Sequence, residues 1–206
     1  MSERLNITNE GGCQGKISFL KNIIGLWLIQ ESRRQWIREG KEYSFGHLEQ
    51  MAADAKPFKA LIDPDAPEFV PAGNIPERIR RYCRESGQRV PENEAEIVRC
   101  IDESLAFKYR MTLEEIKMCT GREYPAIHMV GGGTQSGLLC QMTANACHCP
   151  VIAGPVEATV LGNAAVQLLA AGELRDLDQV RSVAGASAKV SIYEPKDTDQ
   201  WEQVYG

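Results

Sequence analysis

Three consecutive glycines, Gly131, Gly132 and Gly133, are the residues whose type and spacing most directly indicate chemistry. They follow an apolar stretch at 126–130 that is typical of a strand, and they precede a stretch at 135–147 that is typical of a helix. Glycines let a backbone approach a ligand closely, and the amides and dipole at the start of a helix favour an anion. A nucleotide phosphate is the natural ligand for such a loop.

The glycine pattern alone is a weak signal. It does not match G-x-G-x-x-G, because Ser136 stands where the last glycine should be, and no G-K-[ST] follows as it does in a P-loop. A tight turn that serves only packing is therefore the alternative interpretation.

Soft metal ligands gather near the end of the same predicted helix, at Cys140, Cys147, His148 and Cys149. They contain no C-x-x-C pair, so we do not expect a zinc site. The chain has seven cysteines, an odd number, and residues 1–10 contain no apolar signal core. We therefore expect reduced thiols and a cytoplasmic location.

Composition and charge indicate an ordinary globular protein. Of the 206 residues, 43% are hydrophobic and 25% are charged, which are average values for folded domains. The net charge of -5 comes without a basic stripe, so nucleic acid is not an expected partner. The longest apolar run, at 23–29, is too short to cross a membrane. One domain covering 1–206 is expected.

An alternation of strands and helices must position the glycine loop, and it indicates an α/β domain with a helical excursion. The helix expected at 93–119 carries one apolar stripe over many turns, and Ser44 is the expected amino-terminal cap of another helix. Periodicity and turn residues predict strands at 5–8 and 15–19 around a turn at 9–12, helices at 20–39 and 44–55, an ordered proline-rich excursion at 57–76, helices at 76–86 and 93–119, a strand at 126–130, a helix at 135–147, a strand at 150–153, helices at 156–171 and 177–183, and a strand at 189–193.

Two linked motifs resemble the second half of the FGGY carbohydrate kinases. The glycine loop reads VGGGTQS at 130–136, and VIAGPVEATVLGN follows at 151–163. Further stretches narrow the resemblance to the rhamnulokinases and extend it over nearly the whole chain: NITNEGG at 6–12, FLKNI at 19–23, GLWLIQESRRQW at 25–36, IDP at 62–64 and RCIDESLA at 99–106.

The resemblance implies a carboxy-terminal, ribonuclease H-like (actin-like ATPase) domain, one of two that close over ATP, Mg2+ and a ketose sugar. By position, Gly132 and its neighbours Gly131 and Gly133 would line the ATP site, Gln30 would contact the same nucleotide, and Asn22 would contact the sugar. Amide side chains suit such roles because they both donate and accept hydrogen bonds. Periodicity alone favours a different interpretation, with Asn22 at a helix end and Gln30 on a solvated helix face.

The resemblance also implies what this chain lacks. In the family the catalytic aspartate and an amino-terminal phosphate loop precede the NITNEGG stretch, and here only 1–5 precede it. No catalytic residue is assigned, since Asp63 and Asp65 lie in the proline-rich excursion and Asp102 is expected to be solvated on its helix. Glu157 is expected to stabilise a helix start. We expect a nucleotide-binding half that lacks its first strands, is inactive without the missing amino-terminal half, and self-associates through an exposed sheet edge.

A cysteine pair and the choice of sugar remain open. Cys83 and Cys100 match a pair that is disulfide-linked in some rhamnulokinases, and two reduced, neighbouring thiols are the alternative. A second family pair is broken, because Thr143 stands opposite Cys147.

The expected function is ATP-dependent phosphorylation of L-rhamnulose to L-rhamnulose 1-phosphate. Fuculose and xylulose are the alternative sugars. A non-catalytic nucleotide-binding or interaction module that keeps the fold is the alternative class.

Overall fold

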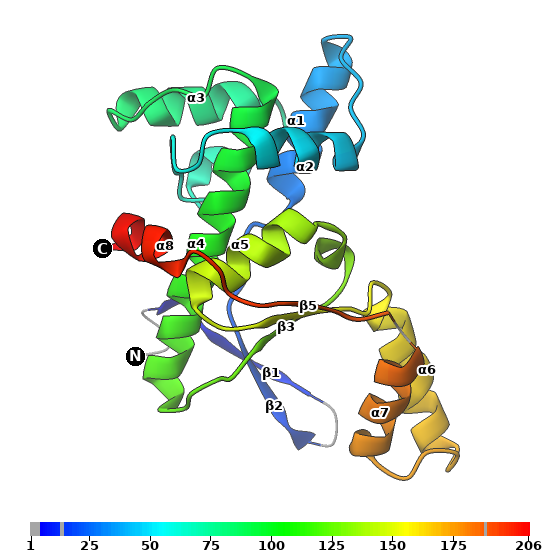
Figure 1. Cartoon of the computed structure of the whole chain (residues 1–206). Helices are drawn as coiled ribbons and strands as arrows, with labels where there is room; N and C mark the ends of the chain where they lie inside the picture. The colour runs from blue at the N-terminus through cyan, green and yellow to red at the C-terminus, as the bar shows by residue number, and fades with distance from the viewer. Residues whose placement is uncertain (1–4, 13–14, 188) are drawn as a thin grey trace. The chain divides into compact units, whose positions relative to one another are not determined.

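The structure is a computed structural model that describes residues 5–12, 15–187 and 189–206 (Figure 1). The chain divides into two compact units, Met1–Tyr124 and Pro125–Gly206, which we call unit 1 and unit 2. Within the described residues, no helix is both long and apolar enough to span a membrane.

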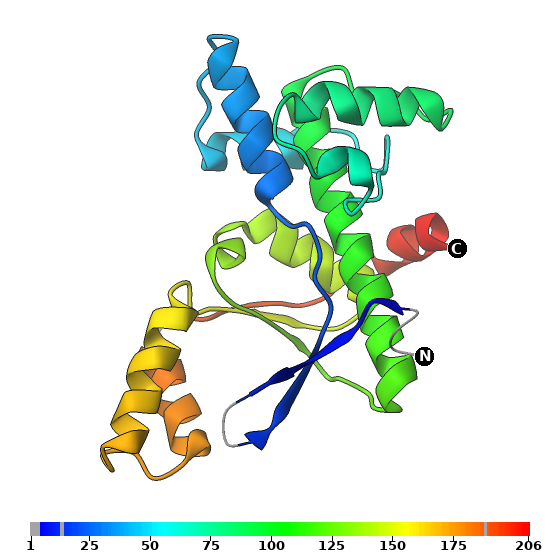
Figure 2. The same cartoon turned by 180° about the vertical axis from the view of Figure 1, so that it is seen from behind.

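Unit 1 begins with an antiparallel hairpin of β1 (Thr8–Gly11) and β2 (Ile17–Leu20), seen from behind in Figure 2. The first strand was expected at 5–8, and the turn expected at 9–12 is largely strand. Pairing with β2 explains the shift, because Gly11 lies opposite Ile17 and the Gly12 amide donates to the Lys16 carbonyl at 2.7 Å. The first strand therefore runs through residues that were expected to form a turn.

The helices of unit 1 are α1 (Trp27–Arg38), α2 (Phe45–Asp54), α3 (Ile75–Glu85) and α4 (Glu94–Thr120), with a short 3-10 helix η3 (Pro67–Phe69) in the proline-rich excursion. Ser44 caps α2 as predicted, since its side chain accepts from the His47 amide at 3.1 Å. The expectation that a helix begins at residue 20 is wrong. The Ile24 amide donates instead to the Asp65 carboxylate at 2.8 Å, which holds residues 21–26 outside the helix.

The proline-rich excursion is ordered, as predicted. The Gln88 side chain accepts from the Leu61 amide and donates to the Leu61 carbonyl, both at 2.9 Å. Farther along, the Arg78 guanidinium donates to the carbonyls of Glu68 and Ala72 at 3.2 and 3.0 Å. These contacts satisfy backbone groups that no helix or sheet would satisfy.

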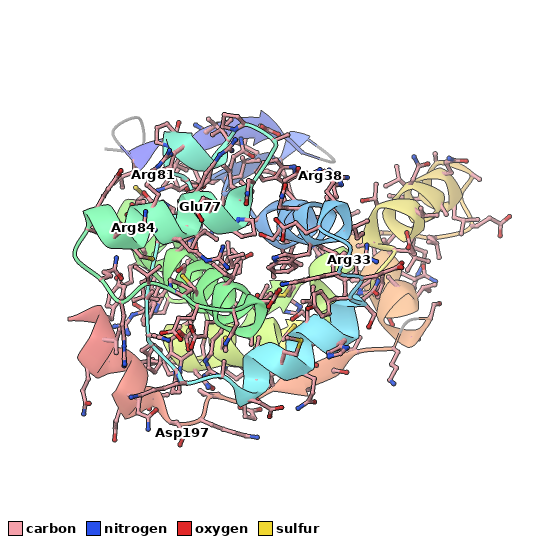
Figure 3. The ribbon with its side chains drawn as sticks, turned by 90° about the horizontal axis from the view of Figure 1, so that it is seen from above. Arg33, Arg38, Glu77, Arg81, Arg84 and Asp197 are labelled. Carbon is pink, nitrogen blue, oxygen red and sulfur yellow. The ribbon has the colours of Figure 1, made fainter. Side chains whose placement is uncertain are left out.

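Most charged side chains of α3 face oppositely charged partners at the surface. Figure 3 shows Glu77, Arg81 and Arg84 along this helix. Arg84 pairs with Glu77 at 3.8 Å, and Arg81 pairs with Glu68 at 3.4 Å. Exposed pairs of this kind each contribute about 0–1 kcal/mol, so packing rather than ion pairing holds α3 in place.

The core of unit 1 lies along α4, which starts at an Asn93 cap and ends at Gly121 in the left-handed conformation. Ile97, Ile101 and Leu105 are all fully buried on this helix. They recur at four-residue spacing, as predicted for one apolar face, and α4 packs chiefly against α2.

Unit 2 contains a three-stranded sheet in the order β3 (Ile127–Met129), β4 (Val151–Ala153) and β5 (Ser191–Tyr193). Strands β3 and β4 are parallel, whereas β4 and β5 are antiparallel. Cys140 and Ala144 of α5 (Gly137–Cys147) pack on β4 to form the core of this unit. The sheet confirms an α/β class.

The remaining helices of unit 2 are α6 (Ala158–Ala170), α7 (Leu177–Ser187) and α8 (Thr198–Tyr205). Helices α6 and α7 lie side by side (Figure 1). The expected end of α7 at residue 183 is too early, and α8 was not expected. Trp201 of α8 is buried, so tertiary packing stabilises a helix whose eight residues are too few to be stable alone.

Self-association through a sheet edge stays a prediction.

Asp102 is buried on α4, and the expectation that it is solvated is wrong. The residue is 1% exposed, and its Oδ1 atom has no hydrogen-bond partner among the residues that the structure describes. Burial, reinforced by the negative charges of Glu49 and Glu103, raises its pKa to about 8, against a smaller lowering by Arg99. Asp102 therefore carries a proton at neutral pH in the folded protein.

We expect Leu105→Ala to lower the free energy of unfolding by about 2–5 kcal/mol, because it opens a cavity at the centre of the α4 packing. Met118→Ala on the same helix is the control, since Met118 is 63% exposed, and it should change stability by less than about 0.5 kcal/mol. Urea denaturation measures both. Equal effects would contradict the assignment of the core.

We expect Asp102→Asn to stabilise the protein increasingly as the pH rises. Asp102 loses its proton near pH 4 when unfolded and near pH 8 when folded, so its contribution to stability falls between those values. The slope approaches about 1.4 kcal/mol per pH unit. Urea denaturation between pH 5 and pH 8 should show this divergence, whereas the exposed Asp54→Asn control should track the wild type. Parallel curves for Asp102→Asn and the wild type would disprove the assignment.

Candidate functional site

The glycine loop lies where the parallel strands β3 and β4 both end. The Gly131 amide donates to the Pro155 carbonyl at 3.0 Å, and the Gly154 amide donates to the Met129 carbonyl at 2.9 Å. Two main-chain hydrogen bonds thus join the segments that leave these strands. Gly131 has a φ of 80°, a left-handed conformation that favours glycine.

A single 3-10 turn, η4 (Gly132–Gln135), connects the loop to α5. Thr134 holds this turn, because its amide and its hydroxyl donate to the Gly131 carbonyl at 3.1 and 2.7 Å. The helix expected from residue 135 begins instead at Gly137, since Ser136 is its cap and accepts from the Leu139 amide at 3.2 Å. Cap chemistry therefore places the helix start two residues later than periodicity suggested.

Gly132 is exposed, and apart from the adjoining main chain no atom of the described residues lies within 4 Å of the position where its Cβ would be. Gly131 and Gly133 on either side are half-buried. Because the first amides of a helical turn have no acceptor within that turn, the loop offers donors to an anion at an open surface. In unit 2 the loop is thus not a packing turn covered by side chains.

Asn22 and Gln30 belong to unit 1, and both side chains are exposed. Gln30 lies in the first turn of α1, so its position on an exposed helix face is confirmed. Asn22 lies in the irregular residues 21–26 between β2 and α1, so its interpretation as a helix-end residue is wrong. Their assigned contacts with nucleotide and sugar stay predictions.

Lys108 is a residue that sequence reasoning missed. Its side chain is 9% exposed, and its ammonium lies 2.9 Å from both Asp63 Oδ1 and Asp65 Oδ2. A signal was present, because Lys108 follows Leu105 by three residues on the apolar stripe of α4, where a cation requires a partner.

Asp63 and Asp65 both pair with Lys108, and the pair holds Asp63 ionised. Burial alone would raise the pKa of Asp63, but hydrogen bonds from Lys108 and the Asp65 amide, with the charges of Lys108 and Lys21, hold it below its usual value. Burial would lower the pKa of Lys108, and its two carboxylate partners raise it. These groups suit holding a structure together rather than transferring protons.

Glu157 is the residue that precedes α6, and its side chain makes no capping hydrogen bond. Its carbonyl accepts from the Leu161 amide at 3.0 Å, so its main chain belongs to the first turn.

Cys83 and Cys100 are buried neighbours with free thiols in this structure. The hydrogen bond from Cys100 lowers the pKa of Cys83, and the same bond together with burial raises that of Cys100. A disulfide between them stays a prediction.

Cys140 in the first turn of α5 and His148 at its end have separate contacts. The Cys140 thiol lies 3.5 Å from the Met129 sulfur, and the His148 ring lies 3.4 Å from the Glu202 carboxylate on α8.

Comparison with known proteins identifies the family. The model of the FGGY family of carbohydrate kinases, C-terminal domain, matches residues 4–171. A rhamnulokinase of Bacteroides thetaiotaomicron is 42% identical over 204 residues, which cover 99% of this chain and 41% of that protein. A rhamnulokinase of Enterococcus faecalis is 41% identical, with 94% and 39% covered. The chain thus spans about two fifths of the length of the curated relatives it matches.

Solved structures share the fold at low sequence identity. A ligand-bound xylulose kinase from Lactobacillus acidophilus superimposes with a TM-score of 0.68 at 15% identity, covering 98% of this chain and 40% of that one. A Plasmodium falciparum glycerol kinase with ADP gives a TM-score of 0.60 at 15% identity, covering 96% and 39%. These likenesses confirm the ribonuclease H-like, actin-like ATPase fold. The chain belongs to the FGGY family of carbohydrate kinases and matches the family's carboxy-terminal domain.

Proposed function

We propose that this chain is the nucleotide-binding part of an ATP-dependent kinase that converts L-rhamnulose to L-rhamnulose 1-phosphate. The observation that carries the proposal is the exposed Gly132 loop, at the ends of two parallel strands and before a helix. Backbone amides in such a place suit the phosphates of a nucleotide.

The assigned residues divide the work between the two ligands. Gly131, Gly132 and Gly133 supply main-chain donors and space for the phosphates, and Gln30 contacts the same nucleotide. Asn22, an exposed amide, exchanges hydrogen bonds with sugar hydroxyls. Mg2+ is the expected cofactor, because it neutralises charge on the transferred phosphoryl group, and no residue of this chain is assigned as its ligand.

The choice of sugar rests on the relatives. The rhamnulokinases are about 40% identical to this chain, whereas the xylulose kinase is 15% identical. Xylulose and fuculose are the alternative substrates. A non-catalytic nucleotide-binding or interaction module is the alternative class.

We further propose that turnover requires the part of the kinase that this chain does not cover. Phosphoryl transfer needs a group that accepts the proton of the attacking hydroxyl. Asp63 and Asp65 are held in ion pairs with Lys108, and Asp102 is buried and protonated, so none of the three suits that role. A cytoplasmic location is part of the same proposal.

We expect the chain to bind ATP with Mg2+, and we expect Gly132→Val to weaken that binding at least about tenfold, because the added methyl groups occupy the space of a phosphate. Isothermal calorimetry measures the affinity. Gly46→Val is the matched control, since its Cβ position is equally open and lies on α2. Both variants should unfold at wild-type urea concentrations. Unchanged ATP affinity in Gly132→Val would remove the basis of the assignment.

A second experiment separates an enzyme part from a binding module. The chain is mixed with ATP, Mg2+ and L-rhamnulose, with and without the remaining part of the Bacteroides thetaiotaomicron rhamnulokinase. Phosphorus NMR should detect a sugar phosphate only in the complete mixture, because the proton acceptor then becomes present. Turnover by the 206-residue chain alone would contradict the proposed inactivity. ATP binding without turnover in either mixture would favour the binding module.

A further inference from the structure

Residues 21–26, which we call the Asn22 segment, have no regular structure to hold them. The pairing of β2 ends at Leu20 and α1 begins at Trp27. Each residue between them has two soft backbone dihedrals, so a side chain here is positioned only if contacts from elsewhere fix the main chain. In this segment Asn22 is the exposed side chain with amide chemistry.

Two contacts from distant parts of unit 1 fix the segment. At its start, the Lys21 ammonium lies 2.5 Å from the Glu115 carboxylate, and the side chains are 10% and 16% exposed. Near its middle, the Ile24 amide donates to Asp65 Oδ1 at 2.8 Å. Asn22 lies between these two anchors.

The second anchor is itself clamped. The other oxygen of Asp65 lies 2.9 Å from Lys108, and Lys108 lies 2.9 Å from Asp63 as well. Asp63 Oδ1 also accepts from the Asp65 amide at 3.1 Å. The carboxylate that receives the Ile24 amide therefore cannot rotate without breaking an ion pair that is largely shielded from water.

Both contacts that fix the Asn22 segment depend on side chains of α4. Lys108 and Glu115 are seven residues apart on α4, which is about two turns, so they project from one face about 10 Å apart. That helix is the most deeply packed element of unit 1, with Ile101 and Leu105 fully buried. Side chains on one face of α4 thus reach the irregular Asn22 segment through one cation and one anion.

We propose that Asp65 is a positioning residue for the sugar, which acts by holding the Asn22 segment through its hydrogen bond with the Ile24 amide while Lys108 fixes its carboxylate. The inference rests on the proposed function, and it adds a role for Asp65 and Lys108. Neither side chain needs to touch the sugar. Their effect is to remove the freedom that Asn22 would otherwise lose on binding.

Amide hydrogen exchange of the full chain tests whether Asp65 holds the Asn22 segment. Asp65→Ala should accelerate exchange at Ile24 at least about tenfold, because the acceptor is lost. Asp65→Asn keeps an oxygen for the amide but loses the ion pair with Lys108, so it should accelerate exchange by less than Asp65→Ala does. Asp63→Asn is the matched control, since it weakens the same lysine pair and leaves the Asp65 acceptor of the Ile24 amide in place. Unchanged Ile24 exchange in Asp65→Ala, or equal acceleration in Asp63→Asn, would overturn the proposal and leave the proposed function intact.

Titration of the same proteins with L-rhamnulose, followed by the NMR shifts of residues 20–30, tests the link to binding. The dissociation constant should rise about tenfold or more in Asp65→Ala and by a smaller factor in Asp65→Asn, while ATP and Mg2+ affinity stays at the wild-type value. A general loss of folding would change both affinities. Wild-type sugar affinity in Asp65→Ala would overturn the role proposed for Asp65 and leave the proposed function intact. An absence of sugar-induced shifts in the wild type would contradict the proposed function itself, and the role of Asp65 would fall with it.

Discussion

Burial of one face of α4 is the constraint on which unit 1 depends. The helix runs from Glu94 to Thr120, and its apolar residues recur so regularly that a single face must turn away from water. Once that face is covered by α2, neighbouring positions are buried whether or not their side chains are apolar. Asp102, Glu103 and Lys108 are the result, three ionisable groups on the buried part of one helix. Lys108 and Asp102 differ in their charge state in the folded protein.

Lys108 keeps its charge, because two carboxylates approach it at 2.9 Å. Asp102 faces Glu49 and Glu103 more than it faces a cation, so its neutral form is favoured. The charge state decides what each residue can do. A paired charge holds a distant loop in place, whereas a buried neutral acid makes stability depend on pH.

Elements whose structure depends on neighbouring residues could be predicted from the sequence. The Ser44 cap, the stripe of α4 and the strand, glycine loop and helix of unit 2 were all predictable from neighbouring residues. The start of α1 was not, because it depends on a hydrogen bond between Ile24 and Asp65, 41 residues apart. Periodicity also could not place Asp102, since it describes a helix face without saying how much of the helix is covered. Asn22 and Gln30 were assigned from the family resemblance, because their exposure alone does not distinguish them from any other solvated residue.

The two candidate contact regions are built from different kinds of bond. The glycine loop is tied to the segment after β4 by main-chain hydrogen bonds, whereas the Asn22 segment is held by carboxylate side chains and an ion pair. Added electrolyte screens charges and leaves amide to carbonyl bonds almost unaffected. High ionic strength would therefore act on the region assigned to sugar, though only weakly because its ion pairs are largely shielded from water, while the region assigned to phosphate kept its shape. The two regions would thus respond differently to salt within a single polypeptide.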